Sequence, residues 1–161
     1  MTEGWDNFFL GQLGASAALG GLLFVAVSIN LERILAAKDL PNRALLAMLL
    51  LLTVLVISAL MLIPAQPTVT LGIEALALGA FVLAVGTAIE ATAAKSPRIT
   101  NRITYAVNVV LFAAAALPYI VGGILLLFGD LSGVYWIAVA IIFSIIKAVV
   151  DGWVLLVEIH R

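Results

Sequence analysis

Two ionisable residues, Lys147 and Asp151, lie inside a long apolar run near the C-terminus, where their charges could form an ion pair or line a polar pathway. The run from Ile137 to Glu158 reads IAVAIIFSIIKAVVDGWVLLVE and is long and apolar enough to cross a bilayer. Ionisable groups in hydrocarbon are costly, so they face a bundle interior or a water-filled cavity, or extend to the interface. We therefore expect other helices to surround these two charges.

Polar residues from four of the five expected helices share a similar depth in the membrane. With a rise of about 1.5 Å per residue, most of them lie roughly 7 to 10 Å inside the cytoplasmic boundary, and the others slightly nearer it or deeper. We expect Lys147 to pair with Glu90 on another helix and with Asp151 on its own. The expected intramembrane polar cluster consists of Glu90, Asn108, Lys147, Asp151, Asn30 and Ser28.

Two interpretations of this cluster remain open. As a structural clamp, it would hold the helices in register near the cytoplasmic face. As the water-filled vestibule of a channel or transporter, it would admit ions from the cytoplasm. The central and outer parts of the expected bundle are nearly free of charge, so polar groups that could continue a path outward are few.

The composition indicates an integral membrane protein. Of its 161 residues, 65% are hydrophobic and 11% are charged, and the mean hydropathy is +1.26. A soluble domain has about a quarter of its residues charged. The net charge of −1 and the lack of a basic stripe predict no nucleic-acid partner. The chain has no cysteine, and no motif predicts a catalytic residue, a metal ligand or a cofactor site.

Five apolar segments predict an all-α fold, a single transmembrane helical bundle over residues 1–161. The second segment is the most uniformly apolar, and we expect it to be the most exposed to lipid. The predicted transmembrane helices cover about residues 8–31, 44–63, 71–94, 103–128 and 134–157.

The distribution of cations predicts the orientation of the bundle. Six of the eight Lys and Arg residues lie in two connections, which five spans place on the same side. Under the positive-inside rule, this side is cytoplasmic, so the N-terminus is outside and the C-terminus inside. The six cations are Arg33, Lys38, Arg43, Lys95, Arg98 and Arg102.

Small residues mark two expected packing faces, because they let neighbouring helices approach closely in a membrane. On the first helix we expect a packing face within the molecule, with contact between subunits as the alternative. On the third helix, glycines recur every seven residues and so share one face. Pro118 should kink the fourth helix and is a candidate hinge. The helix-packing residues are Gly14, Ala17, Ala18 and Gly21 on the first helix, and Gly72, Gly79 and Gly86 on the third.

The segment WDNFF followed by GASAALGGLLFVAVSINLERIL, within about Trp5 to Leu35, resembles the opening of a group of small multi-pass bacterial inner-membrane proteins. Some of these are labelled modulators of a membrane-bound AAA protease. The resemblance carries no catalytic motif and assigns no functional residue. It implies a location in the bacterial plasma membrane and a regulatory or accessory role.

These observations predict a non-enzymatic accessory or regulatory component of the inner membrane. Its partners would be the lipid bilayer and either further copies of itself, as a homo-oligomer, or the other subunits of a membrane complex. The alternative is a small oligomeric ion channel or transporter that uses the cytoplasmic-side polar ring of Glu90, Asn108, Lys147 and Asp151.

Overall fold

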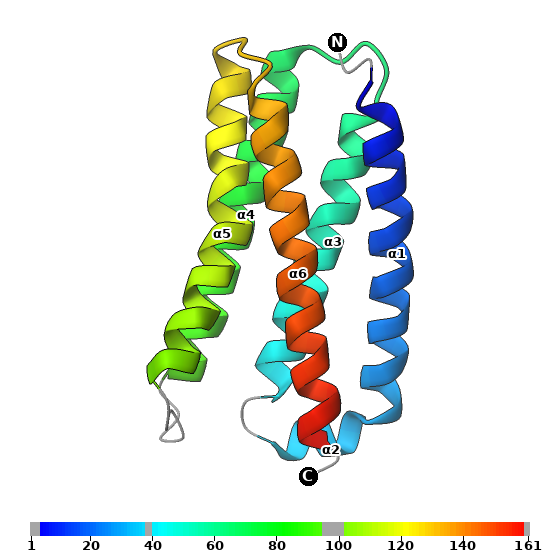
Figure 1. Ribbon diagram of the computed structural model, residues 1–161, viewed down its shortest axis with the longest axis vertical. Coiled ribbons are helices and arrows are strands. Elements are labelled where there is room, and N and C mark those ends of the chain that lie inside the picture. Colours follow the sequence, from blue (N-terminus) through cyan, green and yellow to red (C-terminus); the bar gives the residue numbers. More distant parts are fainter. Residues whose placement is uncertain (1–3, 38–39, 95–101, 160–161) are drawn as a thin grey trace.

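The chain folds into a bundle of helices (Figure 1). The computed structural model describes residues 4–37, 40–94 and 102–159, with side chains except at 93–94, 102–104 and 158–159. The described residues form six helices and no strand. The helices are α1 (Asp6–Ile29), α2 (Leu31–Ala36), α3 (Leu40–Met61), α4 (Thr68–Ala94), α5 (Arg102–Leu127) and α6 (Gly133–Ile159).

Five of these helices, all except α2, are long and apolar enough to cross a membrane. They confirm the five predicted segments, and their ends lie within four residues of the predicted ones. The short helix α2 was not predicted, because its charges suggested an irregular connection. The chain leaves helical geometry at Asn30 (φ −109°, ψ 19°) and resumes it at Leu31. Ile34 is the buried residue of α2.

Local sequence sets the turn between α5 and α6. Gly129 adopts a left-handed conformation with φ +79°, which favours a residue without a side chain. The carboxylate of the next residue, Asp130, accepts a hydrogen bond from the backbone N–H of Ser132 at 2.9 Å. That bond, together with one from the Ser132 side chain, lowers the pKa of the exposed Asp130 carboxyl.

Four helices form a closed ring, in which α3 packs on α4, α4 on α5, α5 on α6 and α6 on α3. Helix α1 lies outside this ring and packs mainly along α3 (Figure 1). The start of α1 and the end of α6 lie at opposite ends of the bundle. We call the end that carries α2 the α2 end, and the other the far end.

The prediction that the second apolar segment is the most exposed to lipid is wrong. In its most apolar stretch, α3 is 56% buried, the highest value among the five spanning helices, whereas α1 is only 6% buried. Helix α3 contacts α1, α4 and α6 at once. Uniform apolarity does not distinguish a lipid-facing helix from a buried one, because lipid tails are as apolar as the side chains of neighbouring helices.

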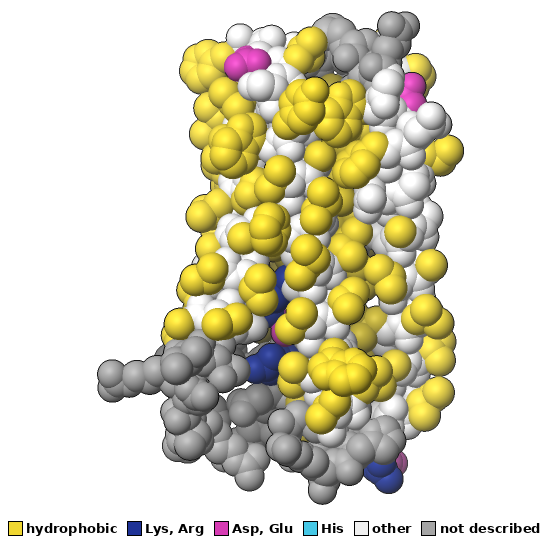
Figure 2. Space-filling view, in the orientation of Figure 1, with side chains coloured by type: hydrophobic (Ala, Val, Ile, Leu, Met, Phe, Trp, Pro, Cys, Tyr) yellow, Lys and Arg dark blue, Asp and Glu magenta, His cyan; other side chains and the backbone are white. Residues whose placement is uncertain are grey.

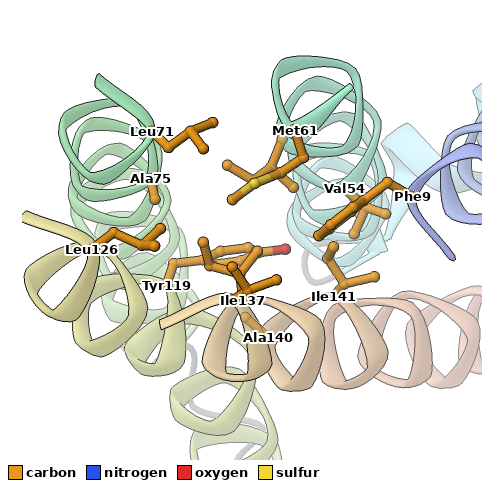
Figure 3. Close-up of a cluster of buried hydrophobic side chains, with 12 residues drawn as sticks. Phe9, Val54, Met61, Leu71, Ala75, Tyr119, Leu126, Ile137, Ala140 and Ile141 are labelled. Atoms are coloured by element: carbon orange, nitrogen blue, oxygen red, sulfur yellow. The ribbon is translucent and has the colours of Figure 1, made fainter. Parts of the chain in front are cut away.

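Apolar side chains fill the interior of the ring toward the far end (Figure 3). Tyr119 crosses the space between helices there, and Phe9 from α1 points toward Val54 and Ile141. At the same end, the ring of Trp5 meets the ring of Tyr135 edge to face with centroids 4.8 Å apart, which joins α1 to α6. We call the buried set the far-end core: Phe9, Val54, Ile57, Met61, Leu71, Ala75, Tyr119, Leu126, Val134, Ile137, Ala140 and Ile141.

Candidate functional site

Three charged side chains meet inside the bundle near the α2 end, and we call them the charged triad. Lys147 donates a hydrogen bond to Asp151 Oδ2 one turn further along α6. Arg43, on α3, directs Nη1 at Asp151 Oδ1 from 3.4 Å. The Asp151 and Lys147 side chains are 0% and 1% exposed, whereas that of Arg43 is 30% exposed. Asp151 is therefore the shared acceptor of two cations.

The sequence of α6 places two members of this triad on one buried face. Residues three or four positions apart lie on the same side of a helix. Ala140, Ser144, Lys147 and Asp151 follow that spacing and are all buried. The predicted ion pair between Lys147 and Asp151 is thus formed within the helix.

Arg43 was missed as a site residue because it was counted as a cation of the connecting loop. It lies in the first turn of α3, which begins at Leu40. Proline is favoured in the first turn of a helix, so Pro41 is a signal in the sequence for a helix that starts before Arg43.

A second set of polar contacts continues from the triad toward the middle of the bundle. The hydroxyl oxygens of Ser144 and Tyr119 lie 3.4 Å apart, and both residues are fully buried. Ser144 also lies 3.5 Å from the carbonyl oxygen of Ala115 on α5. These polar groups end at Tyr119, which belongs to the far-end core.

Glu90 and Asn108 form a separate pair between α4 and α5. Asn108 Nδ2 donates to Glu90 Oε1 at 2.5 Å, and nearby Asn42 Nδ2 donates to Thr92 Oγ1 at 3.3 Å, joining α3 to α4. The predicted pair between Glu90 and Lys147 is wrong, because these two described side chains bond to other partners. Helices α4 and α6 are diagonal in the ring, so each of these residues bonds to a closer group.

Ser28 and Asn30 do not join the triad. Each bonds to the backbone of α1, Ser28 Oγ to the Phe24 carbonyl at 2.8 Å and Asn30 Nδ2 to the Ala26 carbonyl at 3.0 Å. The expected polar cluster is thus divided into the triad, the Glu90–Asn108 pair and two residues that bond to their own helix.

The predicted glycine face of α4 lies against α5. A Cβ added at Gly72 would come 2.8 Å from the backbone nitrogen of Leu127, and one at Gly79 would come 2.9 Å from Tyr119 Cβ. One added at Gly86 would overlap the ring of Phe112. These glycines allow α4 and α5 to approach closely.

The small residues of α1 differ, and the expectation that they form a packing face within the molecule is wrong. In the part of the chain that the structure describes, no atom lies within 4 Å of a Cβ added at Gly14 or Gly21. Ala17 and Ala18 are also exposed. Ser16, which is buried, lies about 200° around the helix from Gly14 and from Ala18. The small-residue stripe of α1, Gly14, Ala17, Ala18 and Gly21, therefore faces away from α3.

The structure leaves two predictions untested in part: the hinge at Pro118 and the positions of the cations that predict the orientation. Pro118 is buried inside α5, which continues through it without a break, and its role as a hinge stays a prediction. Among the cations used to predict orientation, Lys38, Lys95 and Arg98 lie outside the described residues, as does the side chain of Arg102.

An apolar groove of about 260 Å³ runs between α1 and α6 near the α2 end. Its walls include Leu19 and Leu23 of α1, Ile34 of α2, and Trp153 and Leu155 of α6. Its described lining includes no charged side chain. In the part of the chain that the structure describes, no three His, Asp or Glu side chains gather where they could hold a metal ion.

Fold and composition together define a multi-pass helical membrane protein. No family model matches the chain, and the comparisons with curated proteins and with solved structures give no match either.

Proposed function

We propose that this protein is a non-enzymatic accessory or regulatory component of the bacterial inner membrane, and that it assembles through α1. The observation that carries the proposal is the small-residue stripe of α1, which is open to the surroundings along its length. The assembly is a homo-oligomer or a larger membrane complex in which this chain is a subunit.

The use of glycine elsewhere in the bundle supports this role for α1. Glycines in the spanning parts of α4 and α5 lie against another helix, and a Cβ added at Gly123 would come 2.9 Å from the backbone nitrogen of Leu76. Close backbone approach stabilises helix pairs in membranes, where burial of apolar surface gives no driving force. The stripe of small residues on α1, which has no partner among the described residues, has the composition of such an interface.

The proposed orientation has the α2 end in the cytoplasm, with the N-terminus outside and the C-terminus inside. Arg33 and Arg43 both belong to helices at the α2 end. Two of the described carboxylates, Glu74 and Asp130, lie in or beside the connections at the far end. Cations on one side support the positive-inside assignment, and the resemblance of the N-terminal quarter supports the bacterial plasma membrane.

An ion channel or transporter is the second candidate, and the buried polar groups favour it. The charged triad and the Ser144–Tyr119 contact form a polar column that runs from the α2 end toward the middle of the ring. The far-end core fills the interior beyond Tyr119 with apolar side chains. Conduction would therefore need either a rearrangement of that core or a pore on the axis of an oligomer.

Mass measurement of the protein in native-like lipid tests the assembly. We expect the wild-type chain to be oligomeric or bound to a partner, and the double variant Gly14→Leu/Ala18→Leu to dissociate because larger side chains block close approach. Ala15→Leu is the matched control, since Ala15 is also exposed but lies off the stripe. A wild-type monomer without a copurifying partner would refute the proposal.

Flux measurements separate the two candidates. Vesicles of defined lipid containing the purified oligomer should pass no ion above background for several ions and pH values. Flux that is lost in Lys147→Met would instead support the channel.

A further inference from the structure

We propose that the charged triad binds a phosphate-bearing anion, supplied either by a phospholipid headgroup or as free phosphate. This inference uses only contacts within the ring of four helices and does not depend on assembly through α1.

The first argument is charge. Two cations share one carboxylate, so the triad has a net charge of +1 when both are protonated. Glu90, the other carboxylate expected at this depth, accepts its bond from Asn108 and forms an ion pair with neither cation. A net charge that is largely buried is unfavourable, and a bound anion would neutralise it.

The second argument is the surplus of hydrogen-bond donors. A lysine has three N–H donors and an arginine five, and neither has an acceptor. Within the described part of the chain, each of the two cations makes one side-chain hydrogen bond, to Asp151. A phosphate oxygen accepts charge-assisted bonds from both types of side chain, and the planar guanidinium matches phosphate geometry.

Position and access favour a phosphate at the membrane surface. Lys147 is 1% exposed, whereas Arg43 is 30% exposed, so the triad extends from the interior to an accessible surface. Figure 2, which views the bundle from the side, shows Lys or Arg and Asp or Glu side chains in a recess between α5 and α6, with hydrophobic side chains beside them. Lipid phosphates lie at the boundary that this end of the bundle would occupy, and basic pockets between transmembrane helices bind them.

Two variants test the site while leaving the chain a balanced ion pair. Lys147→Met leaves Arg43 with Asp151, and Arg43→Gln leaves Lys147 with Asp151. Each removes the net positive charge and one set of donors. Arg33→Gln is the matched control, because Arg33 is an exposed cation at the same end of the bundle.

The measurement uses the full-length protein in neutral, phosphate-free detergent. Binding is followed by the melting temperature and by native mass spectrometry, with phosphatidylglycerol, inorganic phosphate, or chloride at equal ionic strength. We expect phosphatidylglycerol or phosphate, but not chloride, to bind and raise the melting temperature. Both triad variants should weaken that binding by about tenfold or more, since charge-assisted bonds are lost, and the control by less than about twofold.

The two probes identify the source of the anion. Binding of phosphatidylglycerol without an effect of free phosphate assigns the site to a lipid headgroup, and an equal effect of free phosphate assigns it to a soluble anion. The inference is overturned if neither probe binds, if both triad variants bind like the wild type, or if Arg33→Gln loses as much binding as they do.

Asp151→Asn provides an independent check. Removal of the carboxylate raises the net charge of the triad, so the anion should stabilise this variant more than the wild type. An equal or smaller rise in melting temperature would contradict the proposed site.

Discussion

Arg43 near the start of α3 directs its guanidinium at Asp151 on α6, and Arg43 Nη1 lies 3.4 Å from Asp151 Oδ1. The two residues are 108 positions apart in the chain. Lys147 bonds to the other oxygen of the same carboxylate. Asp151 thus links two helices of the ring and compensates two cations, which makes it the residue on which the triad depends.

We expect the loss of Asp151 to be more damaging than the loss of Lys147. Asp151→Asn leaves two cations near each other without a countercharge and should destabilise the fold by about 3 to 5 kcal/mol, the cost of breaking a buried pair. Lys147→Met leaves the Arg43–Asp151 pair and should cost clearly less. The free energy of unfolding of both variants is measured in mixed micelles without phosphate or anionic lipid. Equal losses of stability in the two variants would show that Arg43 does not compensate the charge of Asp151.

Gly133→Ala should weaken the contact between α5 and α6. A Cβ at Gly133 would come 2.5 Å from the carbonyl oxygen of Gly122. Backbone cannot rotate away as a side chain can, so the helices must separate, at a cost of roughly 1 to 3 kcal/mol. Gly14→Ala is the control, because no atom lies within 4 Å of its added Cβ. Thermal unfolding of the monomer in detergent should show a lower midpoint for Gly133→Ala only.

Asn108→Leu should destabilise the α4–α5 pair. It removes the donor that lies 2.5 Å from Glu90 Oε1, and a partly buried carboxylate without its partner costs about 1 to 3 kcal/mol. Glu90→Gln keeps an acceptor oxygen and is the conservative comparison. Chemical unfolding measures the stability of both variants, and Asn108→Leu should lose more than Glu90→Gln. A larger loss of stability for Glu90→Gln would show that charge, and not the hydrogen bond, stabilises this contact.

Asp130, at the far end, should make a pH-dependent contribution to the stability of the fold. Hydrogen bonds from the backbone and side chain of Ser132 lower the pKa of its carboxyl, so the ionised form is favoured in the folded state. That contribution is present above the unfolded pKa, about 3.9, and is lost as pH falls through the folded value. NMR titration should give a carboxyl pKa below the usual range, and the melting-temperature difference between the wild type and Asp130→Ala should shrink in acid. A difference that grows in acid would contradict this sign.

The sequence was sufficient for the features that depend on one helix at a time. The length and apolarity of each segment predicted the five spanning helices. The spacing of Lys147 and Asp151 predicted their ion pair, because one turn of a helix fixes that geometry wherever the helix is placed.

Features that depend on which helices are neighbours could not be read in the same way. Nothing in the spacing of Glu90 and Lys147 shows that their helices are diagonal in the ring, so a pair was predicted that does not form. Glycine stripes on α1 and α4 look alike in sequence, yet among the described residues only that of α4 has a partner. Small residues indicate close approach but not what approaches.

The two sides of the triad enter the membrane at different times during synthesis. Lys147 and Asp151 belong to the same helix, so α6 is inserted with its internal countercharge already one turn away. Arg43 is synthesised 108 residues earlier than Asp151, and until α6 arrives its long side chain must keep its charge at the interface. Completion of the triad therefore requires that α6 has been inserted beside α3.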